Sequence, residues 1–112
     1  MGLGKDTMMK VVDALNNNPE LQKMMKNWKK IAQYKLDDEV FYLEHKADGT
    51  VEFHDGEHEK PSFTIIASAE LMRDIVEGKK DAQKSFFAKE YQIKGDVMAT
   101  MKLVSLLKKM RK

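Results

Sequence analysis

The sequence has no cysteine, and this absence removes several classes of chemistry. Its 112 residues cannot hold a disulfide framework, a thiolate metal site or a cysteine nucleophile. No apolar run approaches the ~20 residues that span a bilayer, and the first residues lack the apolar core of a signal peptide. The six glycines are isolated from one another, so no glycine-rich phosphate loop is expected. We expect one cytoplasmic domain over residues 1–112, with the 42% hydrophobic and 34% charged content of ordinary globular proteins.

The formal net charge of +2 conceals an uneven distribution. Residues 37–59 contain nine acidic residues and one lysine and carry −8, which leaves +10 for the remainder. Part of this positive charge lies in two basic clusters. They are solvated helix faces or, alternatively, a basic surface attracted to anionic lipid headgroups. Nucleic acid is not expected as a partner, because arginine occurs only twice and the aromatic residues fall on faces predicted to be buried. The first basic cluster is Lys23, Lys26, Lys29 and Lys30, and the second is Lys108, Lys109, Arg111 and Lys112.

Residues that cap helices divide the helical parts of the chain. Each is an Asp, Asn or Ser placed just before a run with helical apolar spacing. In the helix that follows Asn18, the apolar stripe extends to Trp28. The helix that follows Ser68 ends at Gly78. The predicted caps are Asp6, Asn18 (followed by Pro19), Ser68, Asp81 and Asp96.

Alternating apolar residues predict five strands, over residues 32–36, 40–45, 50–54, 62–67 and 91–94. A three-residue loop at 47–49, with Gly49 left-handed, places Phe41, Leu43, Val51 and Phe53 on one face. This order of elements predicts an α+β fold with a mostly antiparallel sheet. Helices should cover one face of it, because Trp28 and Phe86 need burial.

The sequence offers little for catalysis or for a metal. The nearest metal-like group is His54, Asp55, Glu57 and His58, but its spacing matches no established signature, and a polar turn explains it. No serine lies in a nucleophile elbow. We therefore expect neither an enzyme nor a bound metal or other cofactor.

The last predicted helix, residues 97–110, is apolar around most of its circumference. Two stripes together exceed what a surface helix needs. One interpretation is a central core helix. The other is that one stripe seats the helix and the second lines a cavity, in which flexible methionines would suit variable apolar ligands.

Residues 78–107 carry a specific pattern, which consists of Gly78-Lys79, Asp81, Gln83-Lys84, Phe86-Phe87, Ile93-Lys94-Gly95 and Met101-Lys102-Leu103. This pattern resembles the sterol carrier protein-2, or nonspecific lipid-transfer, family. The resemblance implies a five-stranded sheet in the order 3-2-1-4-5, a crossover before the fourth strand, and a hydrophobic tunnel without chemistry. Lys89 and Ala82 stand where that family usually has glycine and proline.

The resemblance implies non-catalytic binding and transfer of a lipid, such as a fatty acid, acyl-coenzyme A, phospholipid, sterol or isoprenoid. An alternative is an accessory protein that holds a lipid precursor, or a partner's apolar helix, for an enzyme of lipid or quinone biosynthesis. The expected lipid-binding residues are Leu71, Ile75, Phe86, Phe87, Ile93, Val97, Met98, Met101, Val104 and Leu107.

Overall fold

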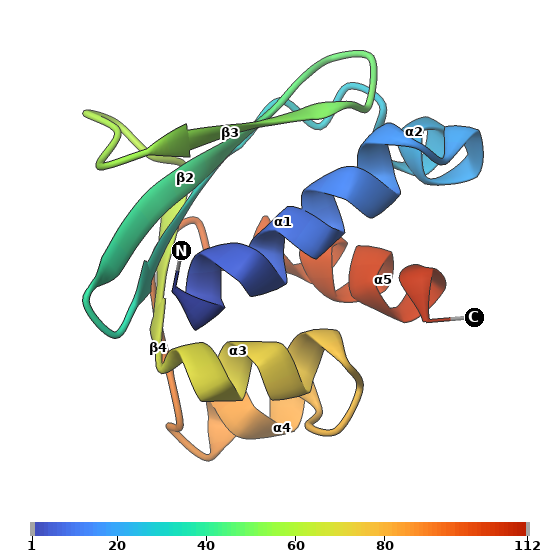
Figure 1. Ribbon diagram of the computed structural model, residues 1–112. Helices are drawn as coiled ribbons and strands as arrows, with labels where there is room; N and C mark the ends of the chain where they lie inside the picture. The colour runs from blue at the N-terminus through green and yellow to red at the C-terminus, as the bar shows by residue number, and fades with distance from the viewer. Residues whose placement is uncertain (1, 112) are drawn as a thin grey trace.

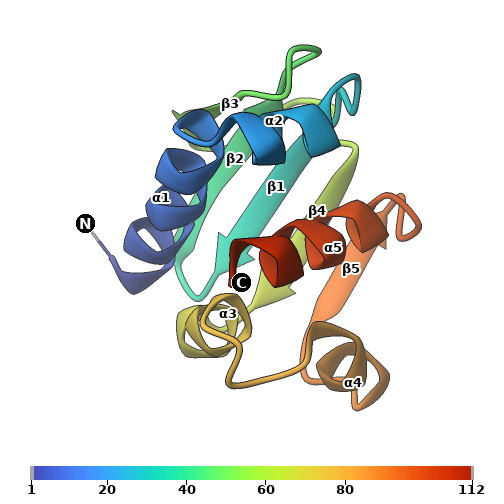
Figure 2. The same ribbon diagram turned by 90° about the vertical axis from the view of Figure 1, so that its right-hand side faces the viewer.

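Five strands form one sheet, and the helices lie on one of its faces (Figures 1 and 2). The computed structural model describes residues 2–111. The strands are β1 (Ile31–Leu36), β2 (Glu39–His45), β3 (Val51–Asp55), β4 (Phe63–Ala67) and β5 (Gln92–Gly95). The helices are α1 (Leu3–Asn16), α2 (Pro19–Met25), α3 (Ala69–Val76), α4 (Ala82–Phe87) and α5 (Thr100–Met110). None of the helices between residues 2 and 111 is long and apolar enough to cross a membrane.

The strand order is β3-β2-β1-β4-β5, which confirms the predicted order. β1 pairs antiparallel with β2 but parallel with β4, and the other two pairings are antiparallel. The parallel pair requires the chain to cross over before β4. The α+β class and the mostly antiparallel sheet are therefore confirmed.

The β2–β3 hairpin has the predicted register. Leu43 lies opposite Phe53 and His45 opposite Val51. The Lys46 amide donates to the Thr50 carbonyl at 2.9 Å, which closes a three-residue loop, and Gly49 is left-handed with φ 92°. The apolar side chains of both strands consequently share the face that the helices cover.

The first helix begins earlier than its expected cap, Asp6. α1 starts at Leu3, and Asp6 lies within its first turn. The carboxylate of Glu39, at the start of β2, accepts from the amides of Gly4 at 2.7 Å and Lys5 at 2.9 Å. A distant side chain thus satisfies two of the free amides of the helix end.

Three predicted caps are confirmed. The Asn18 side chain accepts from the amides of Glu20 and Leu21, and Pro19 follows at the first helical position. The Ser68 and Asp81 side chains accept from amides in the first turns of α3 and α4. Local sequence decides these ends because cap and amide are two or three residues apart.

Two predicted helices are shorter than expected. α2 ends at Met25, and the left-handed Asn27 (φ 67°) turns the chain so that Trp28 lies outside the helix. α5 begins at Thr100, and the Asp96 carboxylate accepts from the Ala99 amide at 3.1 Å within the preceding turn. Asp96 therefore caps this turn instead of α5.

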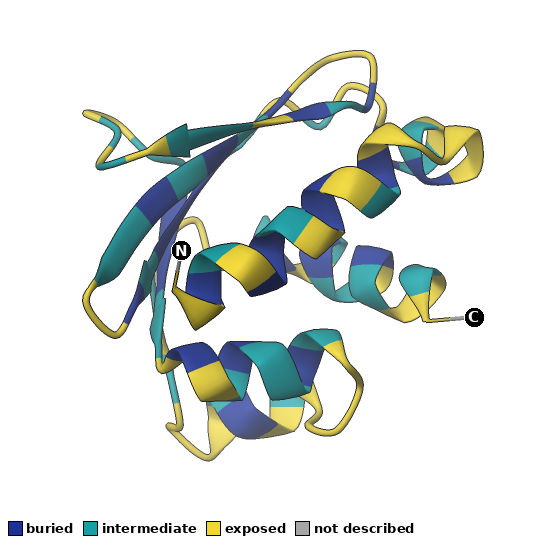
Figure 3. Ribbon diagram, in the orientation of Figure 1, coloured by how far each residue is buried: buried dark blue, intermediate teal, exposed yellow. Residues whose placement is uncertain are grey.

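The core lies between the sheet and the helices, where buried residues of both face one another (Figure 3). The rings of Tyr34 and Phe41 stack on adjacent strands, with centroids 5.4 Å apart. Trp28 is half-buried and contacts the rings of His45 and Phe63 from beyond the end of α2. The other face of the sheet carries mainly polar side chains.

Candidate binding cavity

An apolar cavity lies within this core. Residues from all five strands and from α1, α3, α4 and α5 surround it. Its volume is about 50 Å³. Drug-sized ligands occupy pockets of roughly 300–1,000 Å³, so in this conformation the space suits a small group and not a long chain. A hydrophobic tunnel of the size that the family resemblance implies is not open among residues 2–111, and the tunnel stays a prediction.

Four residues of the predicted lining border the cavity. Ile75 reaches it from α3, Ile93 from β5, and Val104 and Leu107 from successive turns of α5. The two helices and the edge strand that hold these residues are therefore brought together around one space.

The other six predicted residues lie elsewhere. Leu71 and Phe86 are half-buried, and the Phe86 ring packs against Tyr91 with centroids 5.7 Å apart. The remaining four are exposed, and the exposed fractions are 79% for Phe87, 79% for Met98, 42% for Met101 and 40% for Val97.

The late start of α5 explains part of this exposure. Val97 and Met98 lie in the turn that precedes the helix, so the helical stripe expected of them does not form. Met101 lies in the first turn of α5, and its sulfur contacts the Gln83 amide of α4 at 3.7 Å. A role of these residues in binding stays a prediction.

The sequence-based prediction placed no sheet residue other than Ile93 in the lining. Leu43, His45 and Val51 of the hairpin also border the cavity, as does Met8 of α1. A signal for them was present, because positions 41, 43 and 45 alternate onto the same face of β2. The same face of β2 therefore forms one side of the cavity.

His45 is an unusual member of this lining. Its side chain is only 4% exposed, and neither ring nitrogen has a hydrogen-bond partner. The rings of Trp28 and His45 meet edge to face, with centroids 4.8 Å apart and planes at 76°. Burial lowers the pKa of His45 from 6.5 to about 4, because the charged ring would lose its hydration. The imidazole is therefore neutral at pH 7.

The four residues of the metal-like sequence, between positions 54 and 58, do not come together as one group. Asp55 pairs with Lys5 at 2.8 Å, and Glu57 pairs with Lys35 at 2.9 Å. The Nδ1 atom of His58 accepts from the Lys60 amide at 2.9 Å. Each of these residues has its own partner, as a polar turn would provide.

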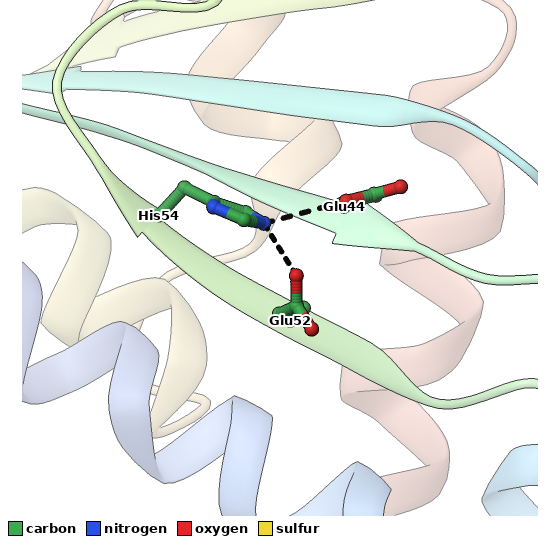
Figure 4. Close-up of side chains that lie close together, drawn as sticks. All are labelled: Glu44, Glu52 and His54. Atoms are coloured by element: carbon green, nitrogen blue, oxygen red, sulfur yellow. Dashed lines mark ion pairs between the residues drawn. The ribbon is translucent and has the colours of Figure 1, made fainter.

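His54 instead belongs to a cluster on the outer face of the sheet (Figure 4). Its Nε2 atom lies 2.7 Å from a Glu52 oxygen and 3.3 Å from a Glu44 oxygen. The Tyr42 ring stacks on the imidazole at 4.8 Å, and Lys46 approaches Glu52 at 3.5 Å. The side chains are partly exposed, so surface ion pairing accounts for the arrangement.

Parts of the two basic clusters meet. Lys23 of α2 and Lys109 of α5 border one surface groove, together with Glu20 and Met24. Lys30 is turned to a different contact, an ion pair with Asp96 at 3.6 Å. Lys112 lies outside the described residues.

Comparison with known proteins gives consistent results. The model of the SCP-2 sterol transfer family matches residues 10–108. The solved structure of a UbiJ-SCP2 ubiquinone synthesis protein is 15% identical with a TM-score of 0.72, and the match covers 88% of this chain and 82% of that chain. Sterol carrier protein 2 from Yarrowia lipolytica, in its apo form, is 21% identical with a TM-score of 0.70, covering 94% and 90%. The sterol carrier protein domain 2 of Helicoverpa armigera is 27% identical with a TM-score of 0.70, covering 93% and 85%. Among curated proteins, none matches the chain.

Proposed function

This chain belongs to the SCP-2 sterol transfer family, and from that premise we propose that residues 1–112 form one domain that binds an acyl or isoprenoid lipid. Membership of the family supports lipid binding, and the family is generally non-catalytic. The proposed ligand occupies the space between the sheet and helices α3, α4 and α5. The protein's role is to hold the lipid and release it to a membrane.

The apolar cavity is the observation that carries this proposal. Its lining is predominantly apolar and comes from elements that are distant in sequence, from Met8 in α1 to Leu107 in α5. An apolar chain that enters this space exchanges its contact with water for contact with apolar side chains, which is favourable.

A long-chain ligand requires this space to expand. The present volume of about 50 Å³ is a small fraction of an ordinary ligand pocket. We propose that α4 moves away from the sheet, because α4 and β5 form the least covered side of the cavity. Ile93, Ala82 and Tyr91 on that side are half-buried, whereas Leu43 and Val51 on the opposite side are buried.

Exposed apolar side chains support entry on the same side. Of the five large apolar residues that are exposed within residues 2–111, four lie between positions 87 and 101. Phe87 and Met98 are the most exposed. Exposed apolar groups on α4, on the turn before α5 and at the start of α5 are suited to contact with a membrane interior or with the lipid itself.

The expected affinity follows from the apolar surface of the ligand. A ~16-carbon chain offers ~12 kcal/mol in gross terms, at ~0.8 kcal/mol per buried methylene. Ordering the ligand and opening the cavity take back several kcal/mol. Dissociation constants in the micromolar to high-nanomolar range result.

Titration with a fluorescent fatty acid, followed by competition with unlabelled palmitic acid, tests the proposal. Saturable binding of one probe per protein molecule and full displacement are expected. No saturable binding at about 10 μM protein would refute it. The variant Val104→Glu is the matched negative, because it places a carboxylate in the cavity lining.

A second candidate is an accessory protein that presents a lipid to a biosynthetic enzyme without transferring it between membranes. The likeness in fold to a UbiJ-SCP2 ubiquinone synthesis protein favours this role. The two candidates differ in a vesicle assay. A transfer protein moves labelled lipid from donor to acceptor vesicles by itself, whereas a presenting protein binds the lipid and leaves the transfer rate unchanged.

A further inference from the structure

His45 is a buried polar group for which the fold supplies no partner. It is the last residue of β2, opposite Val51, and its side chain points to the helix-covered face. Both ring nitrogens are buried and make no hydrogen bond. Buried polar groups in native proteins are nearly always paired, so a group left unpaired calls for an explanation.

Two other polar side chains of the lining are already engaged. The Tyr91 hydroxyl donates to the Ala82 carbonyl at 2.8 Å. The Thr100 hydroxyl donates to the Val97 carbonyl at 2.6 Å. The His45 imidazole, by contrast, is free to form a hydrogen bond with a group inside the cavity. As a neutral ring it offers one donor and one acceptor.

His45 lies on β2, which β1 and β4 separate from β5, and we call this side of the cavity, away from β5, its deep end. The lining residues next to it on the hairpin, Leu43 and Val51, are buried, whereas Ile93 and Ala82 at the β5 and α4 side are half-buried. A lipid that enters from the β5 side meets apolar residues first and His45 last. The group that reaches His45 is therefore the leading end of the ligand.

We propose that His45 recognises an uncharged hydrogen-bonding group, a hydroxyl or a carbonyl, at the end of the lipid that enters the cavity first. This inference rests on the proposed function and adds the chemical class of the ligand. The ligand is a long apolar chain or ring system with a polar group at its buried end. A charged end is disfavoured, because the surrounding lining is apolar and supplies no counter-charge.

Two probes that differ by one hydroxyl test this recognition. They are palmitic acid and 16-hydroxyhexadecanoic acid, which carries a hydroxyl on its last carbon. With the carboxylate at the cavity mouth, the hydroxyl of the second probe reaches the deep end. We expect the wild-type protein to bind both acids with affinities within about threefold of each other, because His45 replaces the hydrogen bonds that the hydroxyl loses.

Substitution at His45 separates this contact from general lipid binding. In His45→Leu the hydroxylated acid should bind about tenfold or more weakly than palmitic acid, since its hydroxyl is buried without a partner. The affinity of each variant for the hydroxylated acid is compared with its own affinity for palmitic acid, so that a general change in the cavity cancels. His45→Gln, which keeps a donor and an acceptor, should recover part of the preference.

A direct measurement on the wild-type protein removes any dependence on how the variants fold. The ring nitrogen resonances of His45, followed by NMR, should shift on addition of the hydroxylated acid well beyond the shift that palmitic acid causes. Equal shifts with both acids would overturn the inference while leaving lipid binding intact. The same holds if the wild-type protein discriminates against the hydroxylated acid as strongly as His45→Leu does. Binding of neither acid would instead refute the proposed function and this inference with it.

Discussion

Replacing His45 by glutamine should remove part of the protein's loss of stability in acid. The pKa of His45 is lowered from 6.5 to about 4 by burial. Between these two values the unfolded chain binds a proton that the folded protein does not. The free energy of unfolding therefore falls as the pH decreases from 6.5 toward 4. Lowering the pKa to this extent corresponds to ~3 kcal/mol, at ~1.4 kcal/mol for each tenfold change in proton affinity.

Urea unfolding at pH 7 and at pH 4.5, for wild type and His45→Gln, measures this contribution. Most of the ~3 kcal/mol should be lost by wild type between the two pH values and spared in the variant. Carboxylates titrate in both proteins, so their contribution cancels in the comparison. His58→Gln is the matched control, because it removes an imidazole that packs against Tyr42 outside the core.

The comparison also has a clear negative outcome. If wild type and His45→Gln lose the same free energy of unfolding between pH 7 and pH 4.5, then His45 accepts a proton in the folded protein as easily as in the unfolded chain. The imidazole would in that case be hydrated or paired, and the description of it as an unpaired group inside the cavity would be wrong.

Three further predictions concern the cavity, one turn and the basic surface. Val104→Glu should lower fatty-acid affinity at least about tenfold, because a carboxylate is costly to bury in the cavity lining. Ser105→Glu, on the exposed side of α5, should leave the affinity unchanged. Equal affinities of the two variants in fluorescence titration would place the ligand elsewhere. Lys89→Gly should raise the free energy of unfolding by up to ~1 kcal/mol, because Lys89 is left-handed with φ 62° after α4; a decrease in urea unfolding would contradict this. Binding to vesicles should require anionic lipid and weaken with salt, because the screening length at physiological salt is ~8 Å. The double variant Lys23→Gln/Lys109→Gln should reduce this binding in cosedimentation, because both lysines border one groove. Equal binding to neutral vesicles would show that these lysines are only solvated surface.

Local signals predicted most of the fold. The register of the hairpin followed from the alternation of Phe41 and Leu43 with Val51 and Phe53, since only one loop length gives an apolar face. The caps Ser68 and Asp81 were also readable, because each bonds an amide three residues away. Where the interaction is local, the sequence is sufficient.

Interactions between distant residues could not be read in the same way. The start of α1 depends on Glu39, a residue 35 positions from Gly4, so no local pattern indicates it. The α5 prediction extended the helix to Val97 because apolar spacing continued through a turn that Asp96 caps. The predicted lining consequently included exposed residues of this turn and omitted His45, whose place in the cavity depends on the packing of sheet against helices.

Native mass spectrometry of the purified protein, with extraction and identification of any bound lipid, tests the central claim most directly. We expect a species heavier than the 12.9 kDa chain by the mass of one lipid, with an acyl or isoprenoid molecule in the extract. Protein stripped of lipid should recover that species when palmitic acid is added in excess. Detection of the bare chain alone, before and after this addition, would contradict the proposal that the domain binds lipid.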